Sequence, residues 1–357
     1  HLCIEKEKKG EEEGEGGYCM RFPSLHQEST ATLALSFLLH LHHPLGRSGS
    51  SLTTPLRRFR LQVAASRGGV RAMSQKAAPT PPRLAVGQLC SIDSQEENFK
   101  QCSLLAHQAK ASGASLLSLP ECFAYMGTPG TSQTRDNAES LSGPLFAQYK
   151  GLARDTGLWL ALGGFHEVCD KGGEDEGKIY NTHAVVDSNG DLVAAYRKLH
   201  LFDVDYDGGF RESRSTAKGK QGLLIKGSPV GNIGVTTCYD LRFPELYTAL
   251  RQAGAEVMLV PSAFMPTTGE AHWEVLLRAR AIETQCYVAA AAQYGTHNAK
   301  RSSYGHALIV SPWGKVLSDL GSSGPGVGTC DLDFGEMAGV RERMPVANHR
   351  RGDVVDV

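Results

Sequence analysis

Three side chains that can take part in covalent chemistry lie where predicted β-strands end. Glu121 closes the apolar run of residues 114–121, and Cys238 closes the run of residues 231–238, just before a helical pattern. Lys198 lies where the second strand of a predicted hairpin leaves its apolar run. Loops at the carboxyl ends of strands converge over the sheet in open α/β folds, so we expect these three residues to share a site.

A thiol, a carboxylate and an ammonium group in one site favour nucleophilic acyl transfer. A cysteine attacks as the thiolate, and a nearby lysine or helix N-terminus lowers the pKa of the thiol. Glu121 can take the thiol proton and pass it to a leaving amine, a step worth about 10²–10⁴ in rate. The ammonium of Lys198 and the backbone N–H of Tyr239 can hold the oxygen that becomes negative in the tetrahedral intermediate. Such a site needs no histidine.

Taken one at a time, these residues have ordinary structural explanations. A cysteine after a strand is more often part of the core. A lysine at the end of an edge strand more often prevents aggregation, and a glutamate after a proline can simply begin a loop. The catalytic interpretation therefore depends on the three residues occurring together.

From residue 84 onward, short apolar runs alternate with segments of helical periodicity. Helices are predicted at 96–113, 143–157, 243–254 and 270–285, strands at 83–89, 114–121, 158–165, 231–238, 255–264 and 286–295, and hairpins at 180–202 and 305–320. Residues 112–121 and 253–262 resemble each other, since each has Gly-Ala, an apolar run and a proline. Because hairpins exclude a purely parallel sheet, the pattern predicts an α/β domain with two mixed sheets packed face to face and helices outside.

The amino-terminal region differs from this domain. Residues 5–16 form a charged low-complexity tract, and no Asp or Glu occurs between Glu28 and Asp93, where arginine and serine are frequent. An acid-poor segment rich in arginine and serine is typical of a mitochondrial transit peptide. We therefore predict that residues 1–82 are a disordered leader with a transit-like segment. A chain started at Met73 would lack that leader, so both mitochondrial and cytoplasmic locations are expected.

The composition argues against several classes of protein. The 357 residues are 41% hydrophobic and 21% charged with a formal net charge of −1, which disfavours nucleic-acid binding through bulk charge. No apolar run approaches the roughly 20 residues that a membrane-spanning helix needs. Nine cysteines without a C-x-x-C pair indicate a reducing compartment rather than a disulfide framework or zinc ribbon. The run at 33–39 leaves a weak secretory signal open, and the histidines at 40–43 have no partner ligand for a metal.

Three sequence blocks around the candidate residues resemble the motifs of the nitrilase (carbon–nitrogen hydrolase) superfamily, in the family's order. They are LPECF (119–123), YRKLHLFD (196–203) and GVTTCYDLRFPEL (234–246). The resemblance extends from about Leu84 to about Arg351. It places a hydrolase domain at residues 83–351 and leaves residues 352–357 as a tail.

The resemblance implies a four-layer α-β-β-α sandwich and a catalytic triad of Glu121, Lys198 and Cys238. It also implies that Glu212 supports the lysine and the substrate, and that the enzyme uses no metal and no organic cofactor. Copies of the chain are expected to pair through the helices that include the segment after the nucleophile, giving a homodimer or a higher homo-oligomer.

Residues 238–246 and 264–283 are most similar to the amidase-type branch of the family. This similarity implies that the substrate is a small α-keto acid amide. Deaminated glutathione would be cut to α-ketoglutarate and cysteinylglycine through a thioester on Cys238.

Residues that bind such a substrate are harder to predict. A guanidinium binds a carboxylate bidentately, which makes Arg242 a candidate, although an ordinary ion pair would explain this arginine equally well. Phe264 and Met265 are expected to line the pocket unless they belong to the core. Tyr125 is expected to close the site from the loop after Glu121.

Other interpretations stay open. The enzyme could be an omega-amidase acting on α-ketoglutaramate, a true nitrile hydrolase or a carbamoylase. The chain could also be a catalytically idle scaffold that binds a protein partner through its outer helices. A papain-like Cys–His protease is disfavoured because no cysteine lies in a C-G-[SA]-C-[WY] motif.

Overall fold

The computed structural model describes residues 59–65, 80–170, 172–205 and 209–354. Every described residue belongs to the compact unit Arg57–Val357. Most of the predicted leader therefore lies outside the described residues, and so does the end of the tail, residues 355–357.

A nine-stranded mixed sheet contains the strand that ends before Glu121. Its main order is β15 (Arg301–Tyr304), β14 (Ala292–Asn298), β2 (Arg83–Leu89), β3 (Leu116–Leu119), β4 (Trp159–Val168), β5 (Ile179–Val186) and β6 (Leu192–Arg197), with β18 (Gly326–Asp331) paired to β2 and β9 (Thr216–Ala217) paired to β5. Strands β2, β3 and β4 are parallel, whereas β4, β5 and β6 are antiparallel. The predicted hairpin at 180–202 is the β5–β6 pair.

A seven-stranded mixed sheet carries the strand that leads to Cys238. Its order is β1 (Leu61–Ala65), β10 (Gly222–Ser228), β11 (Gly231–Val235), β12 (Val257–Leu259), β13 (Tyr287–Ala290), β16 (Leu308–Val310) and β17 (Val316–Asp319). Strands β11, β12 and β13 are parallel, and β13, β16 and β17 are antiparallel. A separate small sheet joins β7 (Asp203–Val204) and β8 (Phe210–Arg211).

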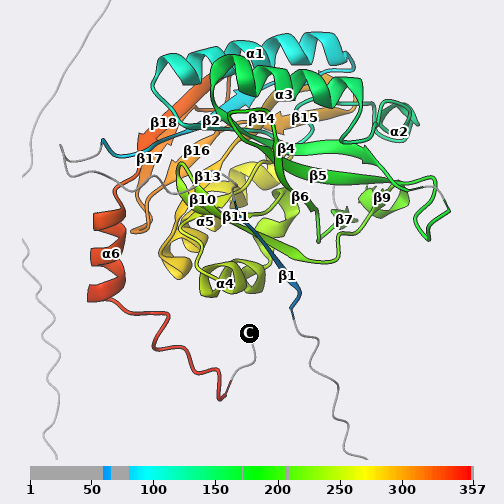
Figure 1. Ribbon diagram of the computed structural model, residues 1–357. Helices are drawn as coiled ribbons and strands as arrows, with labels where there is room; N and C mark the ends of the chain where they lie inside the picture. Colours follow the sequence, from blue (N-terminus) through cyan, green and yellow to red (C-terminus); the bar gives the residue numbers. More distant parts are fainter. Residues whose placement is uncertain (1–58, 66–79, 171, 206–208, 355–357) are drawn as a thin grey trace, which may run out of the picture. The chain divides into compact units, whose positions relative to one another are not determined.

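Helices cover the outer face of each sheet, which completes four layers (Figure 1). Helices α1 (Gln95–Ala111) and α3 (Pro144–Thr156) pack with β2, β3 and β4 in one apolar cluster. Helices α4 (Pro244–Gln252) and α5 (Pro266–Thr284) contact β11 and β13 of the other sheet. The remaining helices are the single-turn α2 (Gln133–Asp136) and α6 (Phe334–Arg343). The predicted α-β-β-α sandwich of two mixed sheets is confirmed.

Local signals explain where these helices begin and end. The side chain of Ser94 accepts a hydrogen bond from the Glu97 N–H at 3.3 Å and so caps α1. Helices α3, α4 and α5 each begin with proline, which is favourable at the first helical position. Gly157 ends α3 with a φ of 66°, a left-handed conformation that glycine adopts without strain.

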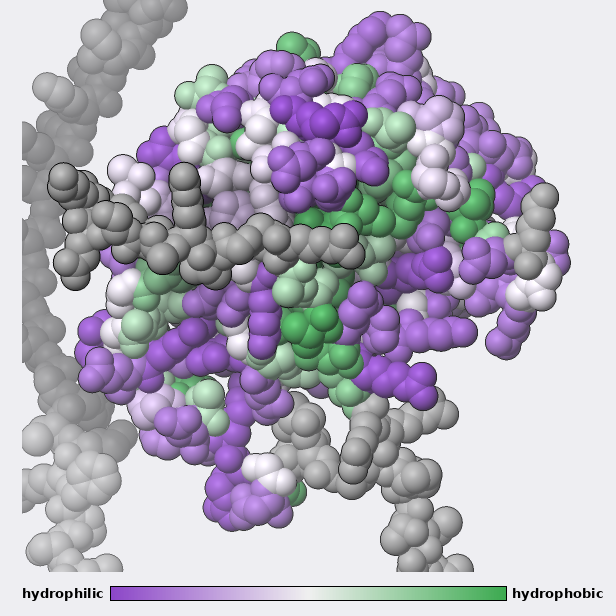
Figure 2. Space-filling view, viewed as in Figure 1, coloured by the Kyte–Doolittle hydropathy of each residue, from purple (hydrophilic) through white to green (hydrophobic). Residues whose placement is uncertain are grey.

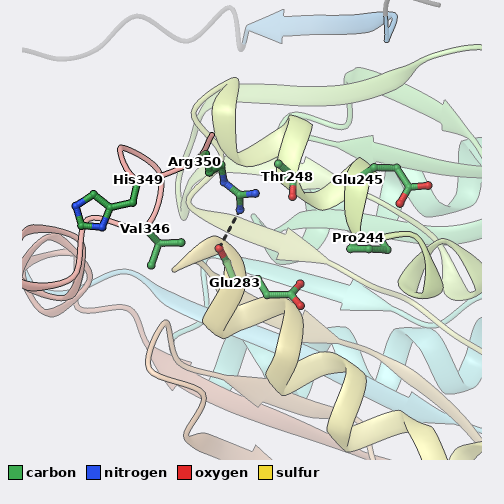
Figure 3. Close-up of a pocket in the computed structure, with 7 residues that line it drawn as sticks. All are labelled: Pro244, Glu245, Thr248, Glu283, Val346, His349 and Arg350. Atoms are coloured by element: carbon green, nitrogen blue, oxygen red, sulfur yellow. Dashed lines mark hydrogen bonds between the residues drawn. The ribbon is translucent and has the colours of Figure 1, made fainter. Parts of the chain in front are cut away.

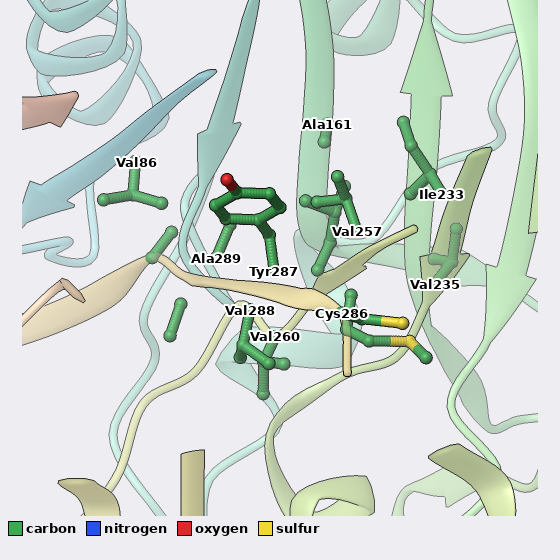
Figure 4. Close-up of a cluster of buried hydrophobic side chains, with 14 of the residues drawn as sticks. Val86, Ala161, Ile233, Val235, Val257, Val260, Cys286, Tyr287, Val288 and Ala289 are labelled. Carbon is green, nitrogen blue, oxygen red and sulfur yellow. The ribbon is translucent and has the colours of Figure 1, made fainter. Parts of the chain in front are cut away.

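The two sheets face each other across an apolar interior (Figure 4). Val86 and Ala161 come from the nine-stranded sheet, and Val235, Val257 and Tyr287 come from the other; all belong to one buried cluster. Burying each large apolar side chain stabilises the fold by about 1.5–3 kcal/mol, so this interior holds the two layers together. The strand ends that carry the candidate residues are fixed by this packing.

One predicted strand is two strands in the structure. Residues 286–295 form β13 in the seven-stranded sheet and then the start of β14 in the nine-stranded sheet. Hydrophobic patterning cannot reveal this crossing, because Ala289 to Ala292 are buried on both sides of it. The crossing joins the two sheets beside the candidate site.

Part of the predicted disordered leader is a strand. Leu61–Ala65 form β1, which pairs in parallel with β10 at the edge of the seven-stranded sheet. The side-chain amide of Gln221 also donates to Gln62 at 2.8 Å. The prediction of disorder is therefore wrong for these residues. Charge and composition alone did not indicate the strand because its partner, β10, lies far along the chain.

The face shown in Figure 2 is mostly hydrophilic, with hydrophobic residues gathered toward its middle. Among the described residues, no helix combines the length and apolar character that crossing a bilayer requires.

Candidate active site

Glu121 lies just past β3, and both oxygens of its carboxylate accept hydrogen bonds. The side chain is buried, and Oε1 accepts hydrogen bonds from Lys198 Nζ and Asn181 Nδ2, both at 2.9 Å. Oε2 accepts the backbone N–H of Ala263 at 3.1 Å. Ala263 follows β12, and the segment that contains β12 resembles in sequence the segment that contains β3. The two similar segments therefore meet at this carboxylate.

Lys198 follows β6 and is buried between two carboxylates. Its Nζ lies 2.9 Å from Glu121 Oε1 and 3.0 Å from Glu212 Oε2, and only 2% of its side chain is exposed. Asn181 joins the same group from β5, because its amide also donates to Glu212 Oε1 at 3.1 Å. The structure thus brings the two predicted acidic residues together around the lysine, and it adds an asparagine that the motifs did not indicate.

Cys238 opens the short 3₁₀ turn η2 (Cys238–Arg242) directly after β11. Its φ is +49°, which is unusual for a residue with a side chain and is held by its surroundings. Its backbone N–H donates to the carbonyl of Pro261 at 2.9 Å. The buried thiol and the Glu121 carboxylate lie close enough for each to shift the pKa of the other. The structure thus brings the three predicted groups together in one buried site.

A buried network around Asp240 holds the turn that presents the thiol. Asp240 is fully buried, and its carboxylate accepts hydrogen bonds from the Tyr196 hydroxyl at 2.7 Å and the Thr237 N–H at 2.9 Å. The ring of His200 also lies against it, with Nδ1 at 2.7 Å. Tyr196 and His200 flank Lys198 in sequence. The network therefore ties the lysine segment to the cysteine turn.

The electrostatics of the site favour a neutral thiol beside an ionised carboxylate. Burial raises the pKa of Glu121, but the charge of Lys198 and the hydrogen bond from Cys238 outweigh burial and lower that pKa below its usual value. Burial raises the pKa of the Cys238 thiol, the Glu121 charge raises it further, and Lys198 only partly opposes them. Lys198 lowers the pKa of the thiol, as the sequence predicts for a nearby lysine, but burial and the Glu121 charge outweigh it, so the net pKa of Cys238 is raised.

The ammonium of Lys198 stays charged in this setting. Burial lowers its pKa, but the carboxylates of Glu121 and Glu212 raise the pKa well above its ordinary value. A permanent positive charge beside a neutral thiol suits an oxygen that becomes negative only during reaction. The backbone N–H of Tyr239 comes directly after Cys238 in η2 and can donate to the same oxygen.

The residues predicted to bind substrate fall into two groups. The guanidinium of Arg242 lies over the rings of Tyr239 and Phe264, with its carbon 5.8 and 5.5 Å from the ring centroids. It meets the ring of His272 at 3.3 Å rather than a carboxylate. Met265 follows Phe264 and caps α5. These residues surround the turn that carries Cys238.

Tyr125 belongs to the second group. It is buried in the loop after Glu121, and the charges that act on its hydroxyl belong to Asp93 and Asp136. Neither of these aspartates is one of the candidate site residues.

A surface pocket of about 620 Å³ lies away from this site (Figure 3). It is lined by residues of α4, the end of α5 and the carboxyl-terminal segment, including Thr248, Glu283 and Arg350. Arg350 donates to the carbonyl of Glu283 across it at 3.4 Å. The pocket contains none of the candidate catalytic side chains. In the described ranges, no cluster of three or more His, Cys, Asp or Glu could hold a metal ion.

The sequence model of the carbon-nitrogen hydrolase family matches residues 83–342, which includes all three motif blocks. The chain belongs to the carbon-nitrogen hydrolase family. It is therefore a hydrolase of carbon–nitrogen bonds with the nitrilase-like fold.

Relatives within the carbon-nitrogen hydrolase family cover most of the chain. A protein of Dictyostelium discoideum named deaminated glutathione amidase is 48% identical over 75% of this chain and 94% of its own length. The human protein of the same name is 46% identical over 87% of this chain and 95% of its own. The crystal structure of the Caenorhabditis elegans NitFhit protein is 39% identical, with a TM-score of 0.71 over 78% of this chain and 67% of that one.

Proposed function

We propose that this enzyme is a thiol amidohydrolase that cleaves deaminated glutathione to α-ketoglutarate and cysteinylglycine. The observation that carries the proposal is that Cys238, Glu121 and Lys198 are buried together in one site, where the Lys198 ammonium lies 2.9 Å from the Glu121 carboxylate. The substrate is suggested by the relatives named deaminated glutathione amidase, which match along most of their length. Repair of a damaged metabolite is the role that such a reaction serves.

In the first half-reaction, the sulfur of Cys238 attacks the amide carbon while Glu121 takes the thiol proton. The carbonyl oxygen becomes negative and is held by the Lys198 ammonium and the Tyr239 N–H. When the tetrahedral intermediate collapses, the C–N bond breaks and Glu121 gives its proton to the leaving amine. Cysteinylglycine leaves, and the acyl group remains on Cys238 as a thioester.

In the second half-reaction, water attacks the thioester. Glu121 takes a proton from the water, the same two donors hold the oxygen, and the C–S bond breaks. The proton on Glu121 returns to the sulfur, so the free enzyme is restored as a neutral thiol and a carboxylate. This resting state agrees with the pKa directions of Cys238 and Glu121. Glu212 keeps the lysine in place through its 3.0 Å contact.

Arg242 is proposed to bind the carboxylate of the α-keto acid half. Its guanidinium faces the rings of Tyr239 and Phe264 and has no carboxylate partner among the described residues. A planar guanidinium suits a carboxylate because two parallel hydrogen bonds can form. Phe264 and Met265 are proposed as apolar walls of the same subsite, with Tyr125 behind the Glu121 loop.

Location and assembly are also proposed. The Arg-rich, acid-poor segment supports a mitochondrial address, and translation from Met73 supports a second, cytoplasmic one. A homodimer or higher homo-oligomer is proposed through the helices that include the segment after Cys238, α4 and α5; on α5, Val275 is 68% and Ile282 43% exposed. Trp313, which is 62% exposed, extends this apolar area. Large exposed apolar side chains that cluster are typical of protein interfaces.

Parallel rate measurements on three substrates test the proposed function. We expect kcat/KM for hydrolysis to be highest with deaminated glutathione and lower with α-ketoglutaramate, both followed as release of α-ketoglutarate. With a simple nitrile, followed as release of ammonia, we expect it to be at least tenfold lower still. A preference for α-ketoglutaramate would make the enzyme an omega-amidase, and a preference for the nitrile would make it a nitrilase. No turnover of any of these substrates, with Cys238 no more reactive to thiol reagents than Cys102, would favour the scaffold.

A further inference from the structure

The hairpin formed by β14 and β15 reaches the loop that follows Glu121. Gln293 of β14 donates to the Glu121 carbonyl at 3.0 Å, and Asn298 at the far end of β14 donates to the Gly127 carbonyl at 3.4 Å. Arg301 begins β15 and pairs with Asn298 across the turn. The hairpin therefore places Arg301 beside the loop of the proposed acid–base residue, on a segment that the three sequence motifs do not include.

Arg301 is partly buried, yet no hydrogen bond or ion pair of its guanidinium is found in the described ranges. Other arginines of the domain do have partners. Arg197, for example, forms two hydrogen bonds with Glu167 at 2.7 and 3.0 Å. The positive charge of Arg301 contributes to lowering the pKa of Glu121, which indicates that the guanidinium is near the site. A partly buried guanidinium without a carboxylate is suited to bind one from a ligand.

His166 of β4 is a second unpartnered polar group in the same place. It is only 8% exposed, and its ring has no hydrogen-bond partner among the described residues. Burial lowers its pKa to about 4, and the charges that act on it are those of Arg301 and Glu121. The ring is thus neutral near pH 7 and can donate one N–H to an anion. Buried polar groups without partners are rare in folded proteins.

The position of these two groups distinguishes them from Arg242. Arg242 lies on the Cys238 turn, over Tyr239 and Phe264. Arg301 and His166 lie on the Glu121 side. Gln293, in the hairpin that carries Arg301, donates to the Glu121 carbonyl at 3.0 Å, and the Gly164 carbonyl, two residues before His166 in β4, accepts the Cys122 N–H at 3.1 Å. Glu121 gives its proton to the leaving amine, so the leaving half of a substrate must extend from that side. In deaminated glutathione this half is cysteinylglycine, which ends in a second carboxylate about 7 Å from the scissile nitrogen when extended.

We propose that Arg301, assisted by His166, binds the terminal carboxylate of the leaving cysteinylglycine half. This assignment rests on the proposed function and makes Arg301 a specificity-determining residue. It explains how the enzyme selects a dipeptidyl amide over a primary amide such as α-ketoglutaramate, which shares the acyl half but has no second carboxylate.

The test compares Arg301→Gln with a matched control, Lys300→Gln, the neighbouring exposed cation on the same turn. Three substrates are used: deaminated glutathione, its glycinamide analogue without the terminal charge, and α-ketoglutaramate. Charge-assisted hydrogen bonds contribute enough that we expect Arg301→Gln to lower kcat/KM for deaminated glutathione roughly 10- to 100-fold. We expect changes of no more than about twofold with the other two substrates, and with Lys300→Gln on all three.

An equal loss on all three substrates would overturn the assignment, because it would indicate a structural role or binding of the acyl carboxylate. Unchanged turnover of deaminated glutathione by Arg301→Gln would overturn it as well. Normal activity on α-ketoglutaramate shows that the variant is folded. If the wild-type enzyme itself fails to cleave deaminated glutathione, the proposed function is overturned and this assignment with it. Failure of the assignment alone leaves wild-type turnover intact.

Discussion

The two sheets of the sandwich supply different halves of the candidate site. The nine-stranded sheet and the segments after its strands supply the charged Glu121 and Lys198 and the neutral amide of Asn181, which are buried and fixed by hydrogen bonds to one another. The seven-stranded sheet supplies Cys238, which is uncharged and fixed through its backbone by a positive φ and a hydrogen bond to Pro261. In the nine-stranded half, hydrogen bonds between side chains hold the charged groups in place. In the seven-stranded half, a strained backbone turn holds the nucleophile in place.

This difference explains why the thiol does not need to be ionised at rest. The single positive charge of the charged half is shared between two carboxylates, since Lys198 lies between Glu121 and Glu212. Burial of the thiol and the charge of the Glu121 carboxylate together outweigh the effect of Lys198 and keep the pKa of Cys238 high. Proton transfer to Glu121 during attack, rather than a stored thiolate, follows from this arrangement.

Removing the carboxylate from the charged half should have the largest effect. We expect Glu121→Gln to lower kcat about 10²- to 10⁴-fold, because the general base and acid is lost. The same change should make Cys238 react faster with iodoacetamide at pH 8, since the Glu121 charge raises the pKa of the thiol. Turnover and alkylation rates, measured together, should thus move in opposite directions. Glu245→Gln, on the exposed start of α4, should change neither.

Slower alkylation in Glu121→Gln would contradict the account of the thiol pKa. It would mean that the carboxylate promotes ionisation of Cys238 instead of opposing it.

Weakening the Asp240 network, which joins the lysine segment to the cysteine turn, should have the next largest effect on kcat. Tyr196→Phe removes the 2.7 Å hydrogen bond to Asp240, and we expect it to lower kcat roughly tenfold because the Cys238 turn loses part of its support. The matched control is Tyr149→Phe, a tyrosine buried in the other apolar cluster with its hydroxyl near Cys102. Melting temperatures and kcat should be compared, and an equal loss of kcat in both variants would argue against a positioning role.

Whether a site residue could be predicted from the sequence depends on whether it lies at the end of an apolar run or inside one. Glu121, Lys198 and Cys238 were predictable because each ends an apolar run, and strand ends converge in α/β folds. Asn181 and Tyr196 were not, because they lie within strands whose pattern indicates only burial. Arg301 is equally hidden, since its place beside Glu121 depends on a hairpin distant in the sequence.

For the fold as well, local sequence patterns predict the helices better than they predict which strands pair. Helices with clear periodicity and terminal signals, such as α1 and α3, were predicted to within a few residues. The division of residues 286–295 between two sheets was not predictable, because both strands are buried and apolar. Strand β1 was missed because local composition in the leader indicates a transit segment, whereas its pairing with β10 is a long-range interaction.

Strand β1 provides a smaller test on the seven-stranded half alone. A chain beginning at Met73 lacks β1 and leaves the edge of β10 unpaired, whereas a chain beginning at Arg57 keeps it. Lost cross-strand interactions predict a melting temperature lower by roughly 2–8 °C for the shorter chain. We expect kcat to differ by less than about twofold, since the site does not include β1. Equal melting temperatures would indicate that β1 does not stabilise the domain.

Changing the pH should have the smallest effect on kcat/KM. With the Glu121 pKa below its ordinary 4.5 and the Cys238 pKa above its ordinary 9.0, neither group titrates between these values. We therefore expect kcat/KM to vary by less than about twofold between about pH 6 and 8.5, measured with buffers of constant ionic strength. A thiolate that had to form before attack would instead give a rate that rises steadily over this range.

The central claim is that the thiol of Cys238 becomes acylated during turnover. Wild-type enzyme mixed with deaminated glutathione, quenched in acid at successive times and digested, should give a Cys238 peptide heavier by one α-ketoglutaryl group. That mass should be absent from Cys238→Ala, which should also release no α-ketoglutarate. An acyl group on a different residue, or continued turnover by Cys238→Ala, would contradict the account.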